Sequence, residues 1–199
     1  MACDAPLVLG FDTSAAHCAA ALLCGDRILA ARAEDMGRGQ AERLMPLLQE
    51  VLAEGGAAWA DLDRIGVGTG PGNFTGIRIS VSAARGLALA LEIPALGVSG
   101  FEAIAQVTPE PHLPVIPGPR GMSYVQAAGE APRLAPPEEI AAFGLPVAER
   151  PAPVQLAEAI ARVAAKREDG ADEAPAPLYV KPADAAPSRD APPVILDDA

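Results

Sequence analysis

The sequence predicts an α/β protein in which helices cover a mixed β-sheet. Three short apolar segments near the N-terminus are joined by short connections, as in an antiparallel meander. Further along, segments with helical periodicity alternate with short apolar segments, as in parallel strands joined by helices. Only four of the 21 prolines precede residue 107, so the first half of the chain has room for regular elements.

The meander is expected at residues 7–11, 17–23 and 27–33. The DTSAA turn between the first two strands places the side chain of Asp12 where it can bond nearby backbone amides. A Gly-Asp turn joins the second and third strands. Both connections are short, so the three strands should run antiparallel.

A helix is expected at residues 40–54, followed by a strand at 64–68. The helix carries a broad leucine stripe, and a Gly-Gly pair ends it. Pro46 is expected in its first turn or at a bend.

A longer helix is expected at residues 73–92, then a strand at 95–98 and a further helix opened by a Ser99–Glu102 capping box. The long helix is apolar over most of its circumference. Because a sheet covers only one side of a helix, we expect a second polypeptide to cover another side. The alternative is that this is the central core helix of a compact monomer.

The second half of the chain is interrupted by prolines. Short strands are expected at PVIPG and SYVQA, and a helix at residues 154–168. The tail from residue 169 is rich in Pro, Ala and Asp, so parts of it are expected to be flexible. Within it, PLYVK is expected to be a short ordered segment. We divide the chain into an N-terminal lobe, residues 1–106, and a smaller Pro-rich C-terminal lobe, residues 107–199.

Composition limits the possible partners and compartments. The formal net charge is −11 and lysine occurs only twice, so strong unaided binding to nucleic acid is not expected. Three cysteines without CxxC spacing argue against a disulfide framework and a zinc site and favour reduced thiols. The N-terminus lacks the features of a signal peptide, and no apolar run approaches the roughly 20 residues of a membrane span. We therefore expect a cytoplasmic protein.

The stretch GTGPGNFTG, residues 68–76, has the glycines of a phosphate-binding loop but no lysine after them. The dinucleotide fingerprint G-x-G-x-x-G fails in every frame. Two interpretations remain: free amides of a helix N-terminus that bind phosphate, or a tight strand-to-helix turn capped by Asn73 or Thr75. The structural interpretation is favoured. The weak candidates for nucleotide binding are Asp12, Thr13, Gly70, Gly72, Asn73 and Thr75.

The sequence contains no recognisable pattern of catalytic residues. The two histidines, His17 and His112, are far apart and form no HxxxH pair, and His17 is better explained as a strand residue than as a ligand. There is no G-x-S-x-G nucleophile motif. We therefore expect no catalytic residue and no metal site, and nothing supports a protease.

Four segments, LGFDTS, QAERLMPLLQEVL, DLDRIGVGTGPGNFTGIRISVSAARGLA and PALGVSGFEAIA, together resemble the bacterial TsaB family, also called YeaZ. The resemblance covers about the first 105 residues. It implies an actin-like (ASKHA), RNase H-type duplicated fold with two lobes, the second one reduced. It also implies a non-catalytic subunit of the complex that forms N6-threonylcarbamoyladenosine at position 37 of tRNAs reading codons that begin with A.

The resemblance further implies the partners. These are TsaD, the catalytic paralogue, and TsaE, a small ATPase, with a homodimer when TsaD is absent, tRNA bound only through the complex, and no membrane. It implies no cofactor for the isolated protein, and leaves ATP or ADP with magnesium to the complex. Pairing is expected through the helices at 40–54 and 73–92. The expected interface residues are Leu44, Leu48, Val51, Phe74, Ile77, Arg78, Val81, Ala84, Arg85 and Ala88.

The chain departs from the family in two places. Gln40 stands where relatives commonly have histidine, and PGPRGMSY (117–124) lacks the acidic residues of the corresponding family motif, although Arg120, Gly121 and Tyr124 match it. The alternative function is a stand-alone actin-like nucleotide-binding enzyme, an ATPase or a kinase-like protein, which would use Asp12 and the glycine loop.

Overall fold

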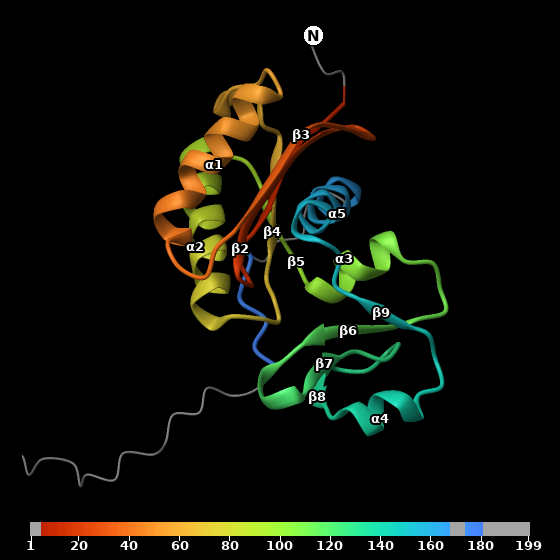
Figure 1. Ribbon diagram of the computed structural model, residues 1–199. Helices are drawn as coiled ribbons and strands as arrows, with labels where there is room; N and C mark the ends of the chain where they lie inside the picture. The colour runs from red at the N-terminus through yellow and green to blue at the C-terminus, as the bar shows by residue number, and fades with distance from the viewer. Residues whose placement is uncertain (1–4, 168–173, 181–199) are drawn as a thin grey trace, which may run out of the picture.

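The computed structural model describes residues 5–167 and 174–180, which form two β-sheets and five α-helices (Figure 1). The first sheet has the order β3-β2-β1-β4-β5. Its first three strands are antiparallel neighbours, while β1, β4 and β5 are parallel. The strands are β1 (Leu7–Asp12), β2 (His17–Cys24), β3 (Arg27–Asp35), β4 (Arg64–Gly68) and β5 (Ala95–Val98).

The second sheet repeats the beginning of the first. Its order is β8-β7-β6-β9, in which β6, β7 and β8 are antiparallel neighbours and β9 is parallel to β6. This matches the β3-β2-β1-β4 part of the first sheet in both order and direction. The duplication expected for an actin-like, RNase H-type fold is therefore confirmed. The strands are β6 (Leu113–Pro117), β7 (Ser123–Val125), β8 (Arg133–Ala135) and β9 (Val147–Glu149).

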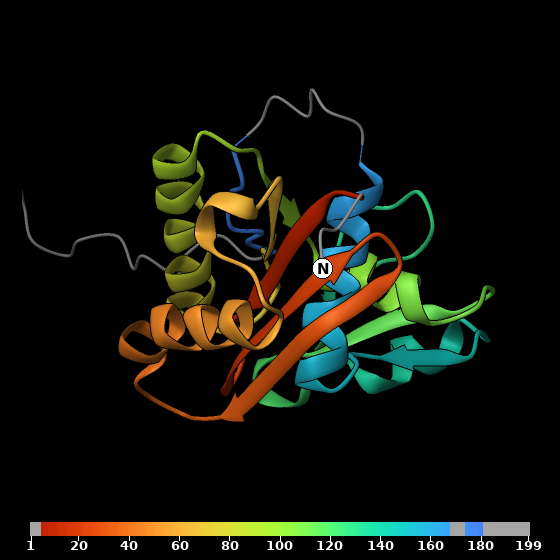
Figure 2. The same ribbon diagram turned by 90° about the horizontal axis from the view of Figure 1, so that it is seen from above.

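Helices cover both faces of the first sheet. In Figures 1 and 2, α1 and α2 lie on one side of it and α5 lies on the other, with α3 beside α5. The helices are α1 (Gln40–Glu54), α2 (Phe74–Leu91), α3 (Gly100–Val107), α4 (Pro137–Ala142) and α5 (Pro153–Lys166). Short 3-10 turns lie at Trp59–Asp61 and Pro119–Gly121.

Two glycines let α5 approach the first sheet closely. Gly10 of β1 and Gly66 of β4 are direct neighbours across the sheet. Neither has room for a Cβ, because the backbone and alanine side chains of α5 occupy that space. α5 comes from the range predicted as the C-terminal lobe, yet it packs on the sheet of the N-terminal lobe.

Most elements lie where the sequence predicts them, including the α3 capping box. Pro46 differs, because it lies in the second turn of an unbroken helix. The sequence did not predict β8, α4 and β9. Two of them are three-residue strands, and α4 begins with Pro137, a residue that opens this helix instead of interrupting it. Most of the tail predicted to be flexible lies outside the described residues.

Two further expectations need correction. Cys24 is disulfide-bonded, whereas Cys18 is a buried free thiol whose pKa burial raises to about 12, so the expectation of reduced thiols is wrong for Cys24. By length and composition alone α2 could cross a membrane, although no apolar run of that length was expected. One such helix is weak evidence for a span, because packed core helices pass the same test.

Candidate functional site

The turn after β1 is organised around a buried carboxylate. Asp12 ends β1 and is 2% exposed. Its Oδ1 accepts hydrogen bonds from the backbone N and the Oγ of Ser14, both at 2.8 Å, and lies 2.7 Å from Nε2 of buried His17. Its Oδ2 packs against Gly68, which has no room for a Cβ. The carboxylate is therefore enclosed by groups of its own chain.

The order of these groups does not suit nucleophilic catalysis. In a catalytic triad the imidazole stands between the hydroxyl and the carboxylate, so that it can take the hydroxyl proton. Here Asp12 stands between Ser14 and His17. Within residues 5–167 and 174–180, no group of three His, Cys, Asp or Glu side chains is placed to hold a metal ion.

The glycine loop before α2 packs directly on this turn. The backbone N of Asn73 donates to the carbonyl of Ser14 at 2.7 Å, and Thr13 Oγ1 donates to the carbonyl of Gly76 at 2.7 Å. Neither Gly72 nor Gly76 has room for a Cβ, because carbonyls of the turn occupy that space. The glycines therefore allow two backbone segments to touch.

Asn73 is the N-cap of α2, since its side-chain oxygen accepts from the N of Gly76 at 2.9 Å. Of the two residues considered for this cap, Asn73 is the one used, and Thr75 lies exposed in the first turn. The candidates Asp12, Thr13, Gly72 and Asn73 are thus brought together, with Gly70 adjoining them. Asp12, Thr13 and Asn73 form their hydrogen bonds with Ser14, His17 and Gly76 of the same two segments.

A cavity of about 400 Å³ lies beside this turn, between the two sheets. Ser14, Gly72 and Asn73 line one side, and Tyr124 and Arg150 of the second sheet and its loops line the other. A smaller cavity of about 170 Å³ adjoins His17 and also includes Arg150. The closed turn therefore forms one wall of the space between the sheets, with its carboxylate turned to internal partners.

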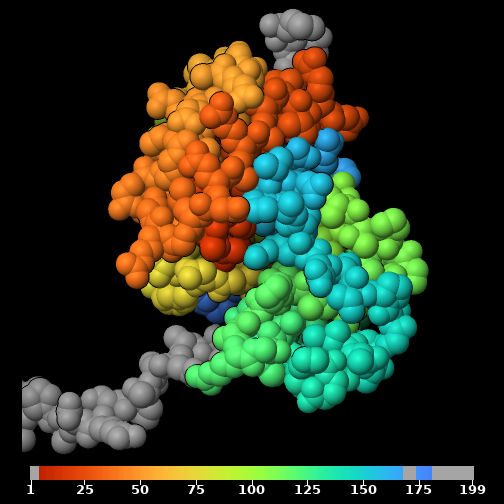
Figure 3. Space-filling view, viewed as in Figure 1, coloured from red at the N-terminus to blue at the C-terminus, as the bar shows by residue number. Residues whose placement is uncertain are grey.

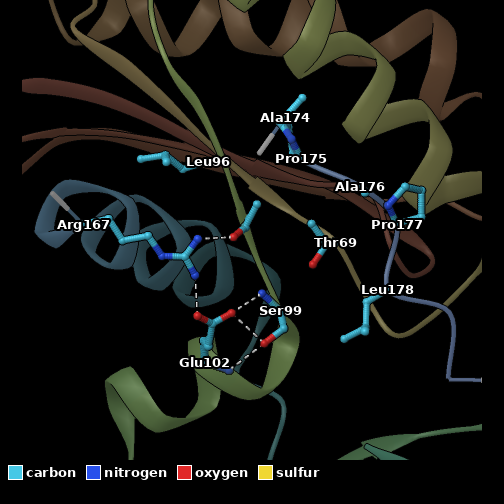
Figure 4. Close-up of a pocket in the computed structure, with 11 residues that line it drawn as sticks. Thr69, Leu96, Ser99, Glu102, Arg167, Ala174, Pro175, Ala176, Pro177 and Leu178 are labelled. Atoms are coloured by element: carbon cyan, nitrogen blue, oxygen red, sulfur yellow. Dashed lines mark hydrogen bonds and ion pairs between the residues drawn. The ribbon is translucent and has the colours of Figure 1, made fainter. Parts of the chain in front are cut away.

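A further cavity, of about 520 Å³, lies at the ends of β4 and β5 (Figure 4). Its charged groups bind each other: Arg167 pairs with Glu102 and donates to the carbonyl of Gly97 at 2.6 Å, and Glu102 accepts from the N of Ser99 at 2.8 Å. Alanine, proline and leucine side chains form much of the remaining wall. This arrangement closes the edge of the sheet.

The two long helices of the first lobe bury one face each against the sheet. Six of the ten expected interface residues lie on these buried faces. A partner could not reach them while the chain is folded, so we correct the expectation that they form the interface surface. The six are Leu44, Leu48 and Val51 of α1, and Ile77, Val81 and Ala84 of α2.

The opposite face of α2 is exposed. Of the 18 residues of this helix, 28% are buried. Leu89 is 84% exposed and lies on the same side as the expected interface residues Phe74, Arg78 and Arg85, while Ala88 is partly buried. We call this side the outer face of α2; it comprises Phe74, Thr75, Arg78, Ser82, Arg85, Gly86, Leu89 and Ala90.

Leu89 was not among the expected interface residues, although its position in the sequence carries a signal. Arg78, Ser82 and Arg85 follow helical spacing, and Leu89 continues the same line. A leucine on the polar line of a helix is an exposed apolar side chain. Gly86 adds to this face, since nothing lies within 4 Å of the position that its Cβ would take.

One end of the outer face carries an aromatic and arginine cluster. The guanidinium carbon of Arg78 lies 3.8 Å from the centroid of the Phe74 ring. The Phe74 and Tyr179 rings stack with centroids 5.1 Å apart, and Arg78 Nε donates to the Tyr179 hydroxyl at 2.8 Å. Tyr179 belongs to residues 174–180, which we call the strap. Figure 3 shows the blue atoms of the strap between yellow atoms near the start of α2 and green atoms of the second sheet.

Ion pairs fix α1 to the edge strand β3. Arg43 pairs with Glu34 at 2.6 Å and with Glu50 at 2.7 Å, and Arg32 pairs with Glu50 and Glu54. Hydrogen bonds from Arg43 lower the pKa of both Glu34 and Glu50 below the ordinary value, and raise the pKa of Arg43 itself. These pairs hold the helix that lies next to α2.

Gln40, one of the two departures from the expected family pattern, connects α1 with the Asp12 turn. Its side-chain amide donates to the carbonyls of Ala15 at 3.2 Å and Met36 at 3.3 Å. The start of α1 and the turn after β1 are thereby held together.

A family model described as TsaD, tRNA N6-adenosine threonylcarbamoyltransferase, matches residues 33–138. The tRNA threonylcarbamoyladenosine biosynthesis protein TsaB of Escherichia coli is 37% identical over 99 residues, which are 50% of this chain and 42% of that protein. TsaB of Haemophilus influenzae is 34% identical over 105 residues, 53% of this chain and 44% of that protein. The matched region thus spans less than half the length of these TsaB relatives.

Other proteins are similar to a longer part of this chain. An uncharacterized protein of Mycobacterium tuberculosis is 35% identical over 184 residues, covering 80% of this chain and 83% of that protein. A crystal structure from Pseudomonas aeruginosa, described as similar to peptidase YeaZ, superposes with a TM-score of 0.72 at 27% identity, over 88% of this chain and 100% of that chain. The structure of YeaZ from the same organism gives a TM-score of 0.68 at 26% identity, over 87% and 99% of the two chains.

Proposed function

Because the chain belongs to the TsaB (YeaZ) family, we propose that it is a non-catalytic scaffold subunit that pairs with TsaD in forming N6-threonylcarbamoyladenosine on tRNA. The modified base is adenosine 37 of tRNAs that read codons starting with A. TsaE joins the complex, the chain pairs with itself when TsaD is absent, and tRNA binds only through the complex. The protein works in the cytoplasm.

The observation that carries this proposal is the outer face of α2. This face exposes Phe74 and Leu89 on a helix of which 28% of the residues are buried. Exposed apolar surface beside small residues is typical of a protein–protein contact, because a second helix can approach closely and exclude water. Gly86, next to Leu89, provides such an approach.

The non-catalytic part of the proposal is supported by the turn after β1. Asp12, the acidic residue that an actin-like ATPase would use for a hydrated metal, is bonded to Ser14 and His17. Two amides of the glycine loop are used within the chain, because the backbone N of Asn73 donates to the carbonyl of Ser14 and that of Gly76 donates to the Asn73 side chain. ATP or ADP with magnesium is assigned to the complex and not to this chain alone.

A charge at Leu89 tests the proposed interface. The Leu89→Asp variant should fold normally, because this side chain is 84% exposed. It should weaken binding to TsaD by about a hundredfold or more, because the apolar contact of Leu89 is lost and a charged carboxylate must be desolvated in the interface. Binding can be measured by calorimetry with TsaD of the same organism, and threonylcarbamoyladenosine by mass spectrometry of tRNA from cells that contain only the variant.

Leu145→Asp is the matched control, because Leu145 is an exposed leucine of the second half, before β9. It should leave both binding and tRNA modification unchanged. A folded Leu89→Asp protein that bound TsaD as tightly as the wild type would refute the proposal. Val81→Glu is unsuitable, because Val81 is buried and the variant would unfold the chain.

A further inference from the structure

We propose that Tyr179 of the strap completes the partner-binding surface on α2. Together with Phe74 and Arg78 it forms a composite site that receives a carboxylate-bearing helix of TsaD. This inference rests on the proposed function and adds to it a contribution from a segment about a hundred residues away in the chain. The composite site is not formed by α2 alone. An interface that consists only of α1 and α2 would therefore lack the contribution of Tyr179.

The strap is held in place independently of Tyr179. The backbone N of Leu178 donates to the carbonyl of Thr69 at 2.9 Å, and the Leu178 side chain packs against the apolar cluster that contains Phe101 and Ile116. Pro175 is buried and lies against Gly97 of β5. Tyr179 is therefore presented by a segment with its own anchors.

The side chains of the aromatic and arginine cluster pack against one another, yet they remain partly exposed to solvent. After stacking, Phe74 is still 43% exposed and Tyr179 44% exposed. Leu89 remains 84% exposed, so the strap leaves the far end of the outer face open. Tyrosine and arginine are enriched among residues that dominate the free energy of protein–protein binding. The strap thus enlarges the surface instead of covering it.

The charge of the face indicates the partner's chemistry. Arg78 uses its Nε for Tyr179, and neither its terminal nitrogens nor Arg85 have a hydrogen bond or ion pair within the described residues. The two arginines are seven residues apart, about 10 Å along the helix. A helix with carboxylates would match both arginines, whereas a second copy of α2, as in the homodimer proposed in the absence of TsaD, would bring like charges together and bind less tightly. The partner helix therefore presents a carboxylate to Arg78.

Two substitutions of Tyr179 test the site by calorimetry with TsaD. Tyr179→Ala should weaken binding about tenfold, because it removes the stacked ring and the orienting hydroxyl. Tyr179→Phe keeps the ring and loses the bond to Arg78, so it should weaken binding by a smaller factor, about twofold to fivefold. Arg78→Gln should weaken binding and reduce its dependence on salt.

Val107→Ala, at an exposed valine at the end of α3, is the matched control and should bind like the wild type. Unchanged or tighter binding of a folded Tyr179→Ala protein would overturn the inference, and tighter binding would show that the strap covers the surface. If Leu89→Asp abolishes pairing while Tyr179→Ala does not weaken it, only this inference fails. If neither variant weakens pairing, the proposed function fails as well.

Discussion

At the scale of single residues, the region around Asp12 shows how a turn with the composition of a ligand site can be used for packing. Its carboxylate, hydroxyl and imidazole groups bind one another, and the glycines opposite them make room for carbonyl oxygens. The hydrogen bonds to this buried carboxylate take the place of hydrogen bonds to water. Removing it would leave the surrounding donors without a partner.

Asp12→Ala should therefore lower stability without changing nucleotide binding. We expect a loss of about 1–3 kcal/mol in the free energy of unfolding, because buried donors lose their acceptor. Urea unfolding followed by circular dichroism measures this loss. Asp35→Ala, at an exposed aspartate that ends β3, should be nearly neutral. Calorimetry with ATP and magnesium should show no tight binding by either the wild type or Asp12→Ala. Tight binding that Asp12→Ala abolishes would favour the alternative of a nucleotide-dependent enzyme.

Part of this region could be predicted from sequence. The Asx-type turn at Asp12, the capping role of Asn73 and the placement of His17 in a strand are confirmed. The Asp12–His17 contact was not predicted. It depends on how the turn folds back between two antiparallel strands, and local residue preferences do not determine that geometry.

At the scale of elements, α2 shows what periodicity can and cannot determine. The sequence predicted a helix apolar on most sides, and the helix is confirmed within a residue of its expected ends. Because two stripes are both apolar, periodicity could not determine which one meets the sheet. The stripe with Ile77 and Val81 is buried against the sheet, and the stripe with Ile79, Ala83 and Leu87 is partly buried. The exposed side is the polar line that Leu89 continues. The choice depends on the shape of the sheet surface, which the sequence of the helix does not contain.

The α1–β3 ion pairs should make stability depend on pH. Arg43 lowers the pKa of Glu34 and Glu50 below the ordinary value of 4.5, so their contribution is present above that pH and is lost as the pH falls through the lower folded-state values. We expect the wild-type Tm to exceed that of Arg43→Met at neutral pH, and the difference to shrink on acidification below about pH 4.5. Thermal scans at several pH values measure this. Arg38→Met, at an exposed arginine before α1, is the control and should follow the wild type at every pH. A difference that stayed constant with pH would contradict the assignment.

At the scale of the whole molecule, the duplicated strand order and the acidic composition determine how the chain can act. The fold class was predicted, yet the second sheet was only partly predicted, because three-residue strands carry too little periodicity to be recognised. The position of α5 on the first sheet was not predicted either. Its apolar stripe indicates that α5 packs on another element, but the stripe does not indicate which one. The folded molecule shows that this element is the first sheet.

The net charge of −11 should keep the free chain off tRNA. In an electrophoretic mobility assay at physiological salt, we expect no shift of tRNA at about 10 μM protein, because phosphate contacts need clustered basic residues. Adding TsaD should produce the shift. A salt-sensitive shift with this chain alone would contradict this expectation.

The position of α5 also bears on how the chain is made. Gly10 and Gly66 leave a hollow in the first sheet that α5 fills, and α5 is encoded well after all five strands of that sheet. As the chain leaves the ribosome, the N-terminal strands are complete long before their second cover exists. That part of the sheet therefore stays exposed to solvent until about residue 166 has emerged, so we expect the first sheet to complete its packing only after most of the chain has been synthesised.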